Sequence, residues 1–196
     1  MLIYAVIVVL AYLLGSVPFG LLLTRWANMG DIRAIGSGNI GATNVLRTGN
    51  KRLAAITLLL DMLKGVLAVS LGRLIGGDDA ALLAGVLVVI GHVFPLWLRF
   101  KGGKGVATGI GVLLGLHPLI GITVIVCWIG VFWFSRFSSV SSMASLGIAP
   151  MLALLTSQYD LAFVTLAIAT MVFFRHRGNI ERLVLGTEPR FHKDTT

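Results

Sequence analysis

The chain has 196 residues, of which 57% are apolar and only 12% charged, and its formal net charge is +8. A soluble domain carries about 25% charged residues, so this composition excludes an ordinary water-soluble protein and indicates one whose surface faces lipid. The basic excess suits either an anionic membrane surface or nucleic acid, and the positions of the charges decide between the two.

Apolar stretches that can cross a bilayer follow one another along the chain. The first, Leu2–Thr24, carries no charge, and it lacks the basic start and the short length of a cleaved signal peptide. Further spans are expected at Leu53–Leu71, Ala80–Leu98, Val140–Thr156 and Leu161–Phe174. These stretches predict an all-α, polytopic membrane protein that forms one domain over residues 1–196.

The stretch Val106–Phe134 is ambiguous, because as one helix it would be about 44 Å long, against a hydrocarbon core of about 30 Å. His117 and Pro118 lie in its middle, and proline disfavours helical backbone at the residue before it. We therefore divide it into Val106–Leu116 and Leu119–Phe134, which gives seven spans in total. The fourth span is then short or partial, and the sequence leaves open whether it crosses the bilayer fully.

The basic residues test this count. With seven spans, three loops and the tail share one side of the membrane and hold 14 of the 16 Lys and Arg residues; they are Arg25–Arg52, Arg99–Gly105, Ser135–Ser139 and Arg175–Thr196. The positive-inside rule places that side in the cytoplasm, with the N-terminus outside and the C-terminus inside. Topology thus explains the net charge, and no nucleic-acid partner is expected.

Three segments on the predicted cytoplasmic side are unlike plain connectors. The first contains three glycines, four small polar residues and a terminal arginine: Gly36, Ser37, Gly38, Asn39, Gly41, Thr43, Asn44 and Arg47. Glycine lets backbone N–H groups approach an anion, small polar side chains add donors, and arginine binds phosphate with two parallel hydrogen bonds. The pattern indicates an oxyanion site, and the alternative is a re-entrant turn capped by Ser37 and Asn39.

The second segment interleaves lysine and glycine just before an expected helix, and consists of Lys101, Gly102, Gly103, Lys104, Gly105 and, within the helix, Thr108. A helix N-terminus favours anions, and a lysine there adds a full charge. The segment does not match the phosphate-binding loop pattern GxxxxGK[ST]. The alternative is a positively charged anchor in a flexible turn, which leaves the three glycines unexplained.

The third segment contains His176, Asn179 and Glu188 among arginines. His176 and Asn179 are three residues apart and therefore share a face if the segment is helical. Histidine titrates near neutrality, so it can donate to phosphate or transfer a proton. A basic anchor for anionic lipid is the alternative, but it does not account for the histidine and asparagine.

Ionisable residues inside the spans are weaker indications. Asp61 and Lys64 are three apart within one span, where charged groups are costly and usually paired; we favour a structural ion pair over a catalytic role. His92 and His117 are interpreted as isolated core or interface residues. No His, Cys and acidic residues have metal-ligand spacing, so neither a metal nor another cofactor is expected.

Serines also gather where the sixth span begins. Arg136 is followed there by Ser138, Ser139, Ser141 and Ser142. These serines can either donate to a substrate phosphate or cap and pack the helix start.

The ordered set of segments resembles the acyl-phosphate:glycerol-3-phosphate acyltransferases, the PlsY family. The resemblance covers nearly the whole chain and includes the Asp61…Lys64 element and the Arg136…Ser142 stretch. It implies transfer of a fatty acyl group from acyl phosphate to the 1-hydroxyl of glycerol 3-phosphate, giving lysophosphatidate and phosphate. This is the first acylation of bacterial phospholipid synthesis, at the cytoplasmic membrane, without acyl-CoA or acyl carrier protein as direct donor.

The resemblance and the residue chemistry together give the expected site. The expected catalytic residues are Ser37, Arg47, Lys104, His176 and Asn179. The expected substrate-binding residues are Gly36, Gly38, Asn39, Gly41, Thr43, Asn44, Gly102, Gly103, Gly105, Thr108, Ser139, Ser142 and Glu188. We favour a substrate phosphate as the proton acceptor over His176.

Two other classes of function remain as alternatives. A transporter of phosphate or organophosphate would also need basic, glycine-rich loops, but the chain shows no long-period repeat of the kind common in transporters. A structural lipid anchor leaves the glycines and asparagines unexplained. We expect a monomer in the lipid bilayer, while the acyl-chain preference and the phosphate that each residue meets stay open.

Overall fold

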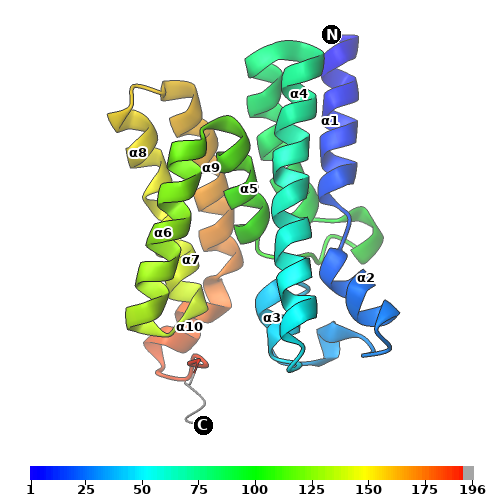
Figure 1. Ribbon diagram of the computed structural model, residues 1–196, viewed down its shortest axis with the longest axis vertical. Coiled ribbons are helices and arrows are strands. Elements are labelled where there is room, and N and C mark those ends of the chain that lie inside the picture. The colour runs from blue at the N-terminus through cyan, green and yellow to red at the C-terminus, as the bar shows by residue number, and fades with distance from the viewer. Residues whose placement is uncertain (192–196) are drawn as a thin grey trace.

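The computed structural model describes residues 1–191 and contains no strand within them (Figure 1). The last five residues of the basic tail, Lys193 among them, lie outside the described part. The helices are α1 (Leu2–Gly15), α2 (Phe19–Trp26), η1 (Ile32–Ala34), α3 (Ala42–Leu46), α4 (Lys51–Val93), η2 (Leu96–Leu98), α5 (Val106–Leu116), α6 (Pro118–Ser135), α7 (Ser138–Gly147), α8 (Ala149–Leu155), α9 (Tyr159–Arg175) and α10 (Arg177–Val184).

The first predicted span is not one continuous helix. α1 and α2 are bent by 41° relative to each other, and Pro18 lies between them. Proline lacks the N–H that a helix needs and disfavours helical backbone before it. The expectation of an unbroken helix over Leu2–Thr24 is therefore wrong, although the bent pair together has the length and composition of a span.

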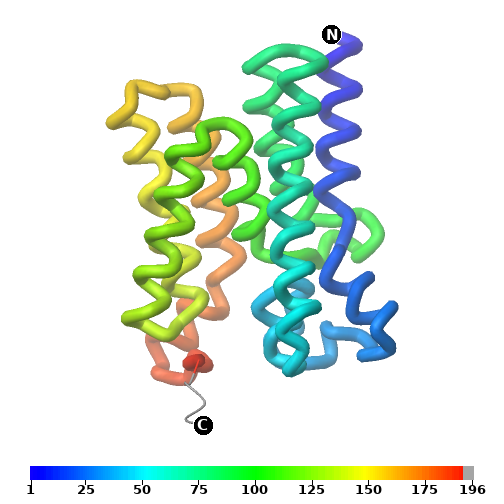
Figure 2. Tube along the Cα trace, viewed as in Figure 1, coloured from blue at the N-terminus to red at the C-terminus, as the bar shows by residue number. Residues whose placement is uncertain are grey.

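The second and third predicted spans are the two arms of α4. The chain reverses at Gly77, whose φ of 77° and ψ of −165° are accessible to glycine. The second arm ends at Val93, five residues before the predicted end, because Pro95 follows. Figure 2 shows the reversal at the end of the molecule where the N-terminus lies.

The break predicted at His117 and Pro118 is present. α5 ends at Leu116 and α6 begins at Pro118, where the Nδ1 of His117 accepts from the Ile120 N–H at 3.4 Å. With 11 residues, α5 rises about 16 Å, roughly half of a bilayer core. The predicted sixth span is α7 followed directly by α8, with Pro150 at the start of α8.

Small residues let the helix backbones approach closely. A Cβ atom on Gly15 of α1 would lie 2.1 Å from the Val88 carbonyl oxygen in α4, and one on Gly111 of α5 would lie 2.0 Å from the Met62 carbonyl oxygen. Close contact through small residues is the usual way for helices to associate in lipid, where apolar side chains gain little by leaving the surrounding phase. α4 therefore packs directly between α1 and α5.

Large apolar side chains cover the outside of the bundle. Val126, Phe163 and Leu155 have exposed fractions of 63%, 73% and 74%. Three helices are long and apolar enough to cross a membrane, and two bent pairs also reach that length, within residues 1–191. An exposed apolar surface of this extent indicates a lipid environment.

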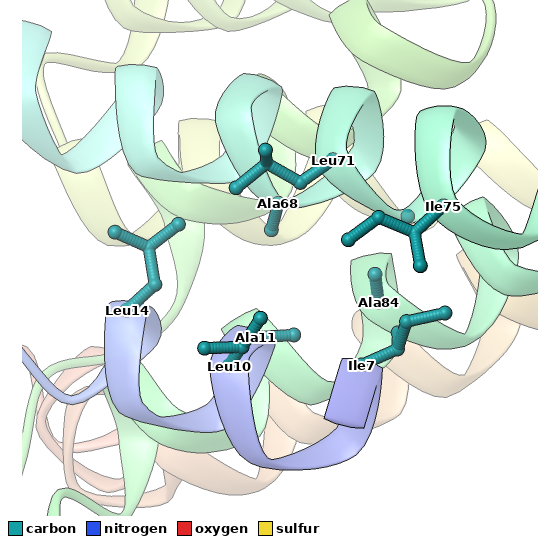
Figure 3. A pocket seen from close by; sticks show the side chains of 9 residues that line it. Ile7, Leu10, Ala11, Leu14, Ala68, Leu71, Ile75 and Ala84 are labelled. Atoms are coloured by element: carbon teal, nitrogen blue, oxygen red, sulfur yellow. The ribbon is translucent and has the colours of Figure 1, made fainter. Parts of the chain in front are cut away.

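A small apolar crevice of about 20 Å³ lies between α1 and α4 (Figure 3). Leu14, Ala68 and Ile75 are among its lining residues, and no polar side chain lines it. The crevice offers no group that could bind or activate a polar substrate. The first and third polar segments lie instead with α3 and α10 at the end opposite the N-terminus, and the second lies before α5, nearer the middle of the molecule (Figure 1).

Candidate active site

A cavity of about 510 Å³ lies among the three polar segments. Its walls come from α3, the starts of α4, α5 and α7, the end of α6 and the chain around α10. All residues predicted to be catalytic line it: Ser37, Arg47, Lys104, His176 and Asn179. So do the following predicted substrate-binding residues: Asn39, Gly41, Thr43, Asn44, Gly105, Ser139, Ser142 and Glu188. The structure thus brings these residues together, while their individual roles stay predictions.

Asn44 organises the first polar segment. Its side chain is buried, and its amide group donates to the carbonyl oxygens of Ile32, Ile35 and Asn39 at 2.8–3.0 Å. Its Oδ1 accepts from the backbone N–H of Ser37 at 3.0 Å. Asn44 therefore shapes the loop through all its hydrogen-bonding groups, while a contact with substrate stays a prediction.

Other residues of this segment also act within the loop. Asn39 Oδ1 accepts from the Gly41 N–H at 2.9 Å. Gly36 and Gly38 have φ values of 58° and 67° and do not line the cavity; their contribution is the turn itself. Thr43 Oγ1 lies 3.3 Å from Ser138 Oγ and so links α3 to α7.

Arg47 differs from its neighbours. It follows α3 directly, is half-buried, lines the cavity, and forms no ion pair with any residue in the described part of the chain. Lys51, the first residue of α4, lines the same cavity and is likewise without a carboxylate partner there. Two such cations can bind an anion that enters the cavity.

A hydrogen-bonded chain connects the second and third polar segments. Lys104 Nζ donates to Asn179 Oδ1, and Asn179 Nδ2 donates to Glu188 Oε1 at 2.6 Å. The Ser139 hydroxyl donates to the same carboxylate oxygen at 2.7 Å, and Arg182 Nε donates to Oε2 at 2.8 Å. Glu188 and Ser139 thus bind each other and orient Asn179 and Lys104, while direct contact of either residue with a substrate stays a prediction.

The charges of Glu188 and Lys104 in this hydrogen-bonded chain follow from burial and hydrogen bonding. Burial raises the pKa of Glu188, but hydrogen bonds from Asn179, Ser139 and Arg182 outweigh it, and the net pKa is lowered. Burial lowers the pKa of Lys104 to about 8, while nearby Glu188 opposes this and Arg182 adds to it. At neutral pH the site thus contains a carboxylate and a mostly charged ammonium.

His176 is a neutral hydrogen-bond acceptor in this site. Its Nδ1 lies 2.8 Å from the Val172 carbonyl oxygen, so Nδ1 carries the ring hydrogen and Nε2 the lone pair. Burial, together with the positive charge of Lys104, lowers the pKa of His176 to about 4. This differs from the expectation that His176 titrates near neutrality, and the part that His176 plays toward a substrate stays a prediction.

Gly102 and Gly103 do not line the cavity. Their N–H groups donate to the carbonyl oxygens of Val93 and His92 at 3.1 and 3.0 Å. Their own carbonyl oxygens accept from the Arg175 guanidinium at 3.1 and 3.2 Å. This corrects the expectation that both glycines offer their N–H groups to a phosphate.

The remaining hydroxyl predictions also change. Thr108 is fully buried in the first turn of α5 and does not line the cavity. Ser142 does line it, but its hydroxyl donates to the Ser138 carbonyl oxygen at 2.7 Å and accepts from Trp128 Nε1 at 3.1 Å. Ser138, one of the serines expected at the start of the sixth span, and Trp128 also line the cavity. Trp128 was not predicted, because it belongs to no recognisable motif.

An ionic cluster lies beside the cavity within α4. Lys64 Nζ is 2.7 Å from Asp61 Oδ1, which agrees with the predicted ion pair. His92, interpreted from the sequence as an isolated residue, joins this pair with its Nδ1 2.8 Å from Lys64 Nζ. Asp61 and His92 both line the cavity. Only the folding of α4 into two antiparallel arms brings positions so far apart in the sequence together.

One wall of the cavity is apolar. Lys51 on α4 is followed on the same helix face by Ala54, Ala55, Leu58 and Met62, at the spacing of one face of a helix. Ile110 from α5 and Ile125 and Ile129 from α6 also line the cavity. The cavity therefore joins a cationic region to an apolar one, and it suits a ligand with an anionic group and an acyl chain.

The chain matches one protein family over most of its length. The family described as glycerol-3-phosphate acyltransferase matches residues 5–186. A glycerol-3-phosphate acyltransferase of Sinorhizobium fredii is 53% identical over 180 residues, covering 91% of this chain and 88% of that protein. One of Rhodopseudomonas palustris is 50% identical over 188 residues, covering 96% of both chains.

Two solved structures are also similar. The crystal structure of PlsY, an integral membrane glycerol 3-phosphate acyltransferase, in its glycerol 3-phosphate form, has a TM-score of 0.92, 34% identity and 96% coverage of both chains. Its lysophosphatidic acid form gives a TM-score of 0.90 with the same identity and covers 96% of this chain and 95% of the other. These similarities give the transporter alternative no support. The family match, the sequence relatives and the similar solved structures agree: this chain is a membrane acyltransferase and belongs to the glycerol-3-phosphate acyltransferase family.

Proposed function

We propose that the enzyme transfers an acyl group from acyl phosphate to the 1-hydroxyl of glycerol 3-phosphate and releases lysophosphatidate and inorganic phosphate. The observation that carries this proposal is the shape and charge of the cavity. Arg47, Lys51 and Lys104 lie at its cationic part, and the apolar wall of α4, α5 and α6 continues from there. Two phosphate-bearing substrates, one of them with an acyl chain, match this combination.

The reaction needs little covalent participation by the protein. The glycerol oxygen attacks the carbonyl carbon of the acyl phosphate, forming the new ester bond as the bond between that carbon and the phosphate oxygen breaks. The leaving phosphate is a good leaving group, so holding the hydroxyl about 3 Å from the carbonyl carbon supplies much of the rate. Arg47 stabilises the phosphate or the developing oxyanion.

A substrate phosphate accepts the proton of the hydroxyl. A phosphate monoester has a second pKa of about 6, whereas burial lowers the pKa of His176 to about 4. The phosphate is thus the stronger base, and the neutral Nε2 of His176 accepts a hydrogen bond that orients the hydroxyl. Lys104 and Asn179 bind glycerol 3-phosphate beside it, together with Ser37.

Replacing His176 by Gln tests this assignment. We expect the KM for glycerol 3-phosphate to rise, while the dependence of kcat on pH between about 3 and 8 keeps its wild-type form. If His176 were the base, the wild-type profile would contain a limb near pH 4, where His176 titrates. That limb would disappear in His176→Gln while the KM stayed near the wild-type value.

The proposed reaction is tested with purified protein in lipid nanodiscs, palmitoyl phosphate and glycerol 3-phosphate. Lysophosphatidate and inorganic phosphate should form in equal amounts, and palmitoyl-CoA should not replace the donor. A folded sample that forms no product from palmitoyl phosphate would contradict the proposal, and so would product formed only from palmitoyl-CoA. Arg47→Ala should form lysophosphatidate more slowly than the wild type in the same assay, because it lacks the proposed cation for the phosphate or the oxyanion.

We propose further that seven segments cross a bacterial cytoplasmic membrane, with the N-terminus outside and the active site at the cytoplasmic face. The two arms of α4, α6, the pair α7–α8 and the two bent pairs account for six, and α5 for the seventh. The N-terminus and the described end of the chain lie at opposite ends of the molecule (Figure 1), as an odd number of crossings requires. We also propose that the enzyme acts as a monomer.

A further inference from the structure

Lys64 is held by three acceptors within the helix bundle. Its Nζ lies 2.7 Å from Asp61 Oδ1 and 2.8 Å from His92 Nδ1, and it donates to the Val17 carbonyl oxygen at 3.1 Å. The Lys64, Asp61 and His92 side chains are each at most 4% exposed. Because an ammonium group has three hydrogens, these contacts fix Lys64, and with it the orientation of the His92 ring.

The opposite edge of the His92 ring lies against Gly103. A Cβ atom on Gly103 would lie 2.0 Å from His92 Nε2, and the next nearest atoms, at 2.7 and 2.8 Å, belong to the same ring. A side chain on residue 103 therefore cannot fit while the ring stays in place. The ring cannot turn away without removing an acceptor from Lys64.

The backbone on both sides of this contact is tied down. The His92 carbonyl oxygen accepts from the Gly103 N–H, and Arg175 donates to the Gly102 and Gly103 carbonyl oxygens from the other side. Lys104, which lines the cavity, comes next in the chain. The ring thus acts as a spacer that determines how closely the Lys104 loop approaches α4.

A purely structural role explains this cluster poorly. Replacing a buried ion pair by well-packed apolar residues is often neutral or stabilising, because the charges lose their hydration. Ionisable groups within membrane-embedded helices are accordingly most often tied to function. Here the cluster ends in a rigid ring directly beneath a substrate-binding loop.

We propose that His92, fixed by the Lys64–Asp61 ion pair, is a positioning residue that sets the place of Lys104 through its contact with Gly103. The inference rests on the proposed function only in taking glycerol 3-phosphate as the ligand of Lys104. His92 acts through the Lys104 loop and not through contact with the reacting atoms.

A double-mutant cycle tests the contact. Gly103→Ala should lower kcat/KM for glycerol 3-phosphate about 10- to 100-fold, as expected for a shift of the loop by about 1 Å, with the KM for palmitoyl phosphate little changed. Adding His92→Ala removes all three nearest clashing atoms. The double variant should therefore recover about fivefold or more over Gly103→Ala, a coupling that contacting residues show.

Gly102→Ala is the matched control. A Cβ atom there would lie 2.2 Å from the His92 carbonyl oxygen and 2.3 Å from Pro95 Cδ, neither of which His92→Ala removes. His92→Ala should therefore not rescue Gly102→Ala. If His92→Ala impairs folding, His92→Asn replaces it, because its amide oxygen can still accept from Lys64 while the ring edge is gone.

The outcomes separate the two proposals. If wild-type protein forms no lysophosphatidate, the proposed function fails, and the same cycle is then read from the thermal shift that glycerol 3-phosphate produces. If wild-type protein is active but the double variants show the product of the single variants' losses in kcat/KM, the His92 proposal alone is overturned. Equal rescue of Gly102→Ala and Gly103→Ala would overturn it too, as would double variants that fail to fold where both single variants fold.

Discussion

Lys104 is half-buried beside Asn179, and this partial burial limits the pH range in which it can bind a phosphate. Because the pKa of Lys104 is lowered to about 8, its side chain is charged below that pH and neutral above it. We predict that kcat/KM for glycerol 3-phosphate falls as the pH rises through about 8, since this ratio reports the free enzyme. Initial rates between pH 6 and 9.5, roughly the range in which the lysine titrates, measure the effect.

Lys104→Arg should move this fall beyond the measured range, because arginine stays charged, although its different shape lowers the rate. Lys101→Arg is the control: Lys101 is exposed and does not line the cavity, so its profile should match the wild type. A wild-type profile that stays flat to pH 9.5 would refute the assignment of Lys104 to the phosphate.

Lys51 lines the cavity where the apolar face of α4 begins, which suits the phosphate end of an acyl phosphate. We predict that Lys51→Ala raises the KM for palmitoyl phosphate about tenfold, equivalent to roughly 1.4 kcal/mol, and leaves the KM for glycerol 3-phosphate within about twofold. Arg52→Ala is the control, because Arg52 is exposed and does not line the cavity. Equal effects of the two substitutions would show that only the general positive charge matters.

At the residue scale, the sequence indicated which side chains gather but not what each one contacts. Arg47 and Lys104 were predicted from their type and place among glycines, and both line the cavity. Glu188 has its donors in Asn179, Ser139 and Arg182, and such intramolecular contacts depend on the tertiary fold. A motif therefore marks a site without separating residues that bind substrate from those that orient them.

The contact between α4 and α5 carries a prediction at the scale of elements. A Cβ atom on Gly111 would lie 2.0 Å from a backbone oxygen of α4, which no rotamer change can relieve. We predict that Gly111→Ala lowers the free energy of unfolding by about 2 kcal/mol, within the range for overpacking, and lowers the activity because α5 carries the Lys104 loop. Thermal unfolding in detergent measures the change.

Gly130 provides the matched control in α6, because a Cβ atom there would have no neighbour within 4 Å. Alanine is a better helix former than glycine by about 0.5–1 kcal/mol. Gly130→Ala should therefore keep or raise the stability and leave the activity unchanged. A similar loss in both variants would point to general sensitivity of the bundle to alanine.

The helix boundaries show which breaks a sequence reveals. Pro118 was used to divide one long apolar stretch, and α5 and α6 meet there. Pro18 breaks the first span by the same mechanism, but that apolar run has the length of one span, so length gave no reason to divide it. At the break, the Val17 carbonyl oxygen accepts both from the Phe19 N–H and from Lys64, and only the fold reveals the contact with Lys64.

For the whole molecule, the order of the helices determines where the site forms. The second and third polar segments and the start of α7 are far apart in the sequence, yet Lys104, Asn179 and Ser139 meet in one hydrogen-bonded chain through Glu188. The cavity forms because the connections that carry the polar segments line it together, with α3 and α10 at the end opposite the N-terminus and the connection before α5 nearer the middle of the molecule (Figure 1). Charge counting had grouped the same connections on one side of the membrane.

This arrangement predicts which loops an impermeant reagent can reach. Asp79 is exposed near the reversal of α4, at the end where the N-terminus lies (Figure 2), and Lys101 is exposed in the second polar segment. With Cys127, the one cysteine of the chain, replaced by Ala, Asp79→Cys should react with a membrane-impermeant maleimide in intact bacterial cells. Lys101→Cys should react only after the cells are opened, because basic loops face the cytoplasm.

Each variant must retain lysophosphatidate synthesis, which shows that the substitution preserves the fold. The reverse labelling pattern would place the N-terminus and Asp79 inside the cell and the active site at the outer face. The enzyme would then lack access to cytoplasmic glycerol 3-phosphate, which the proposed reaction requires.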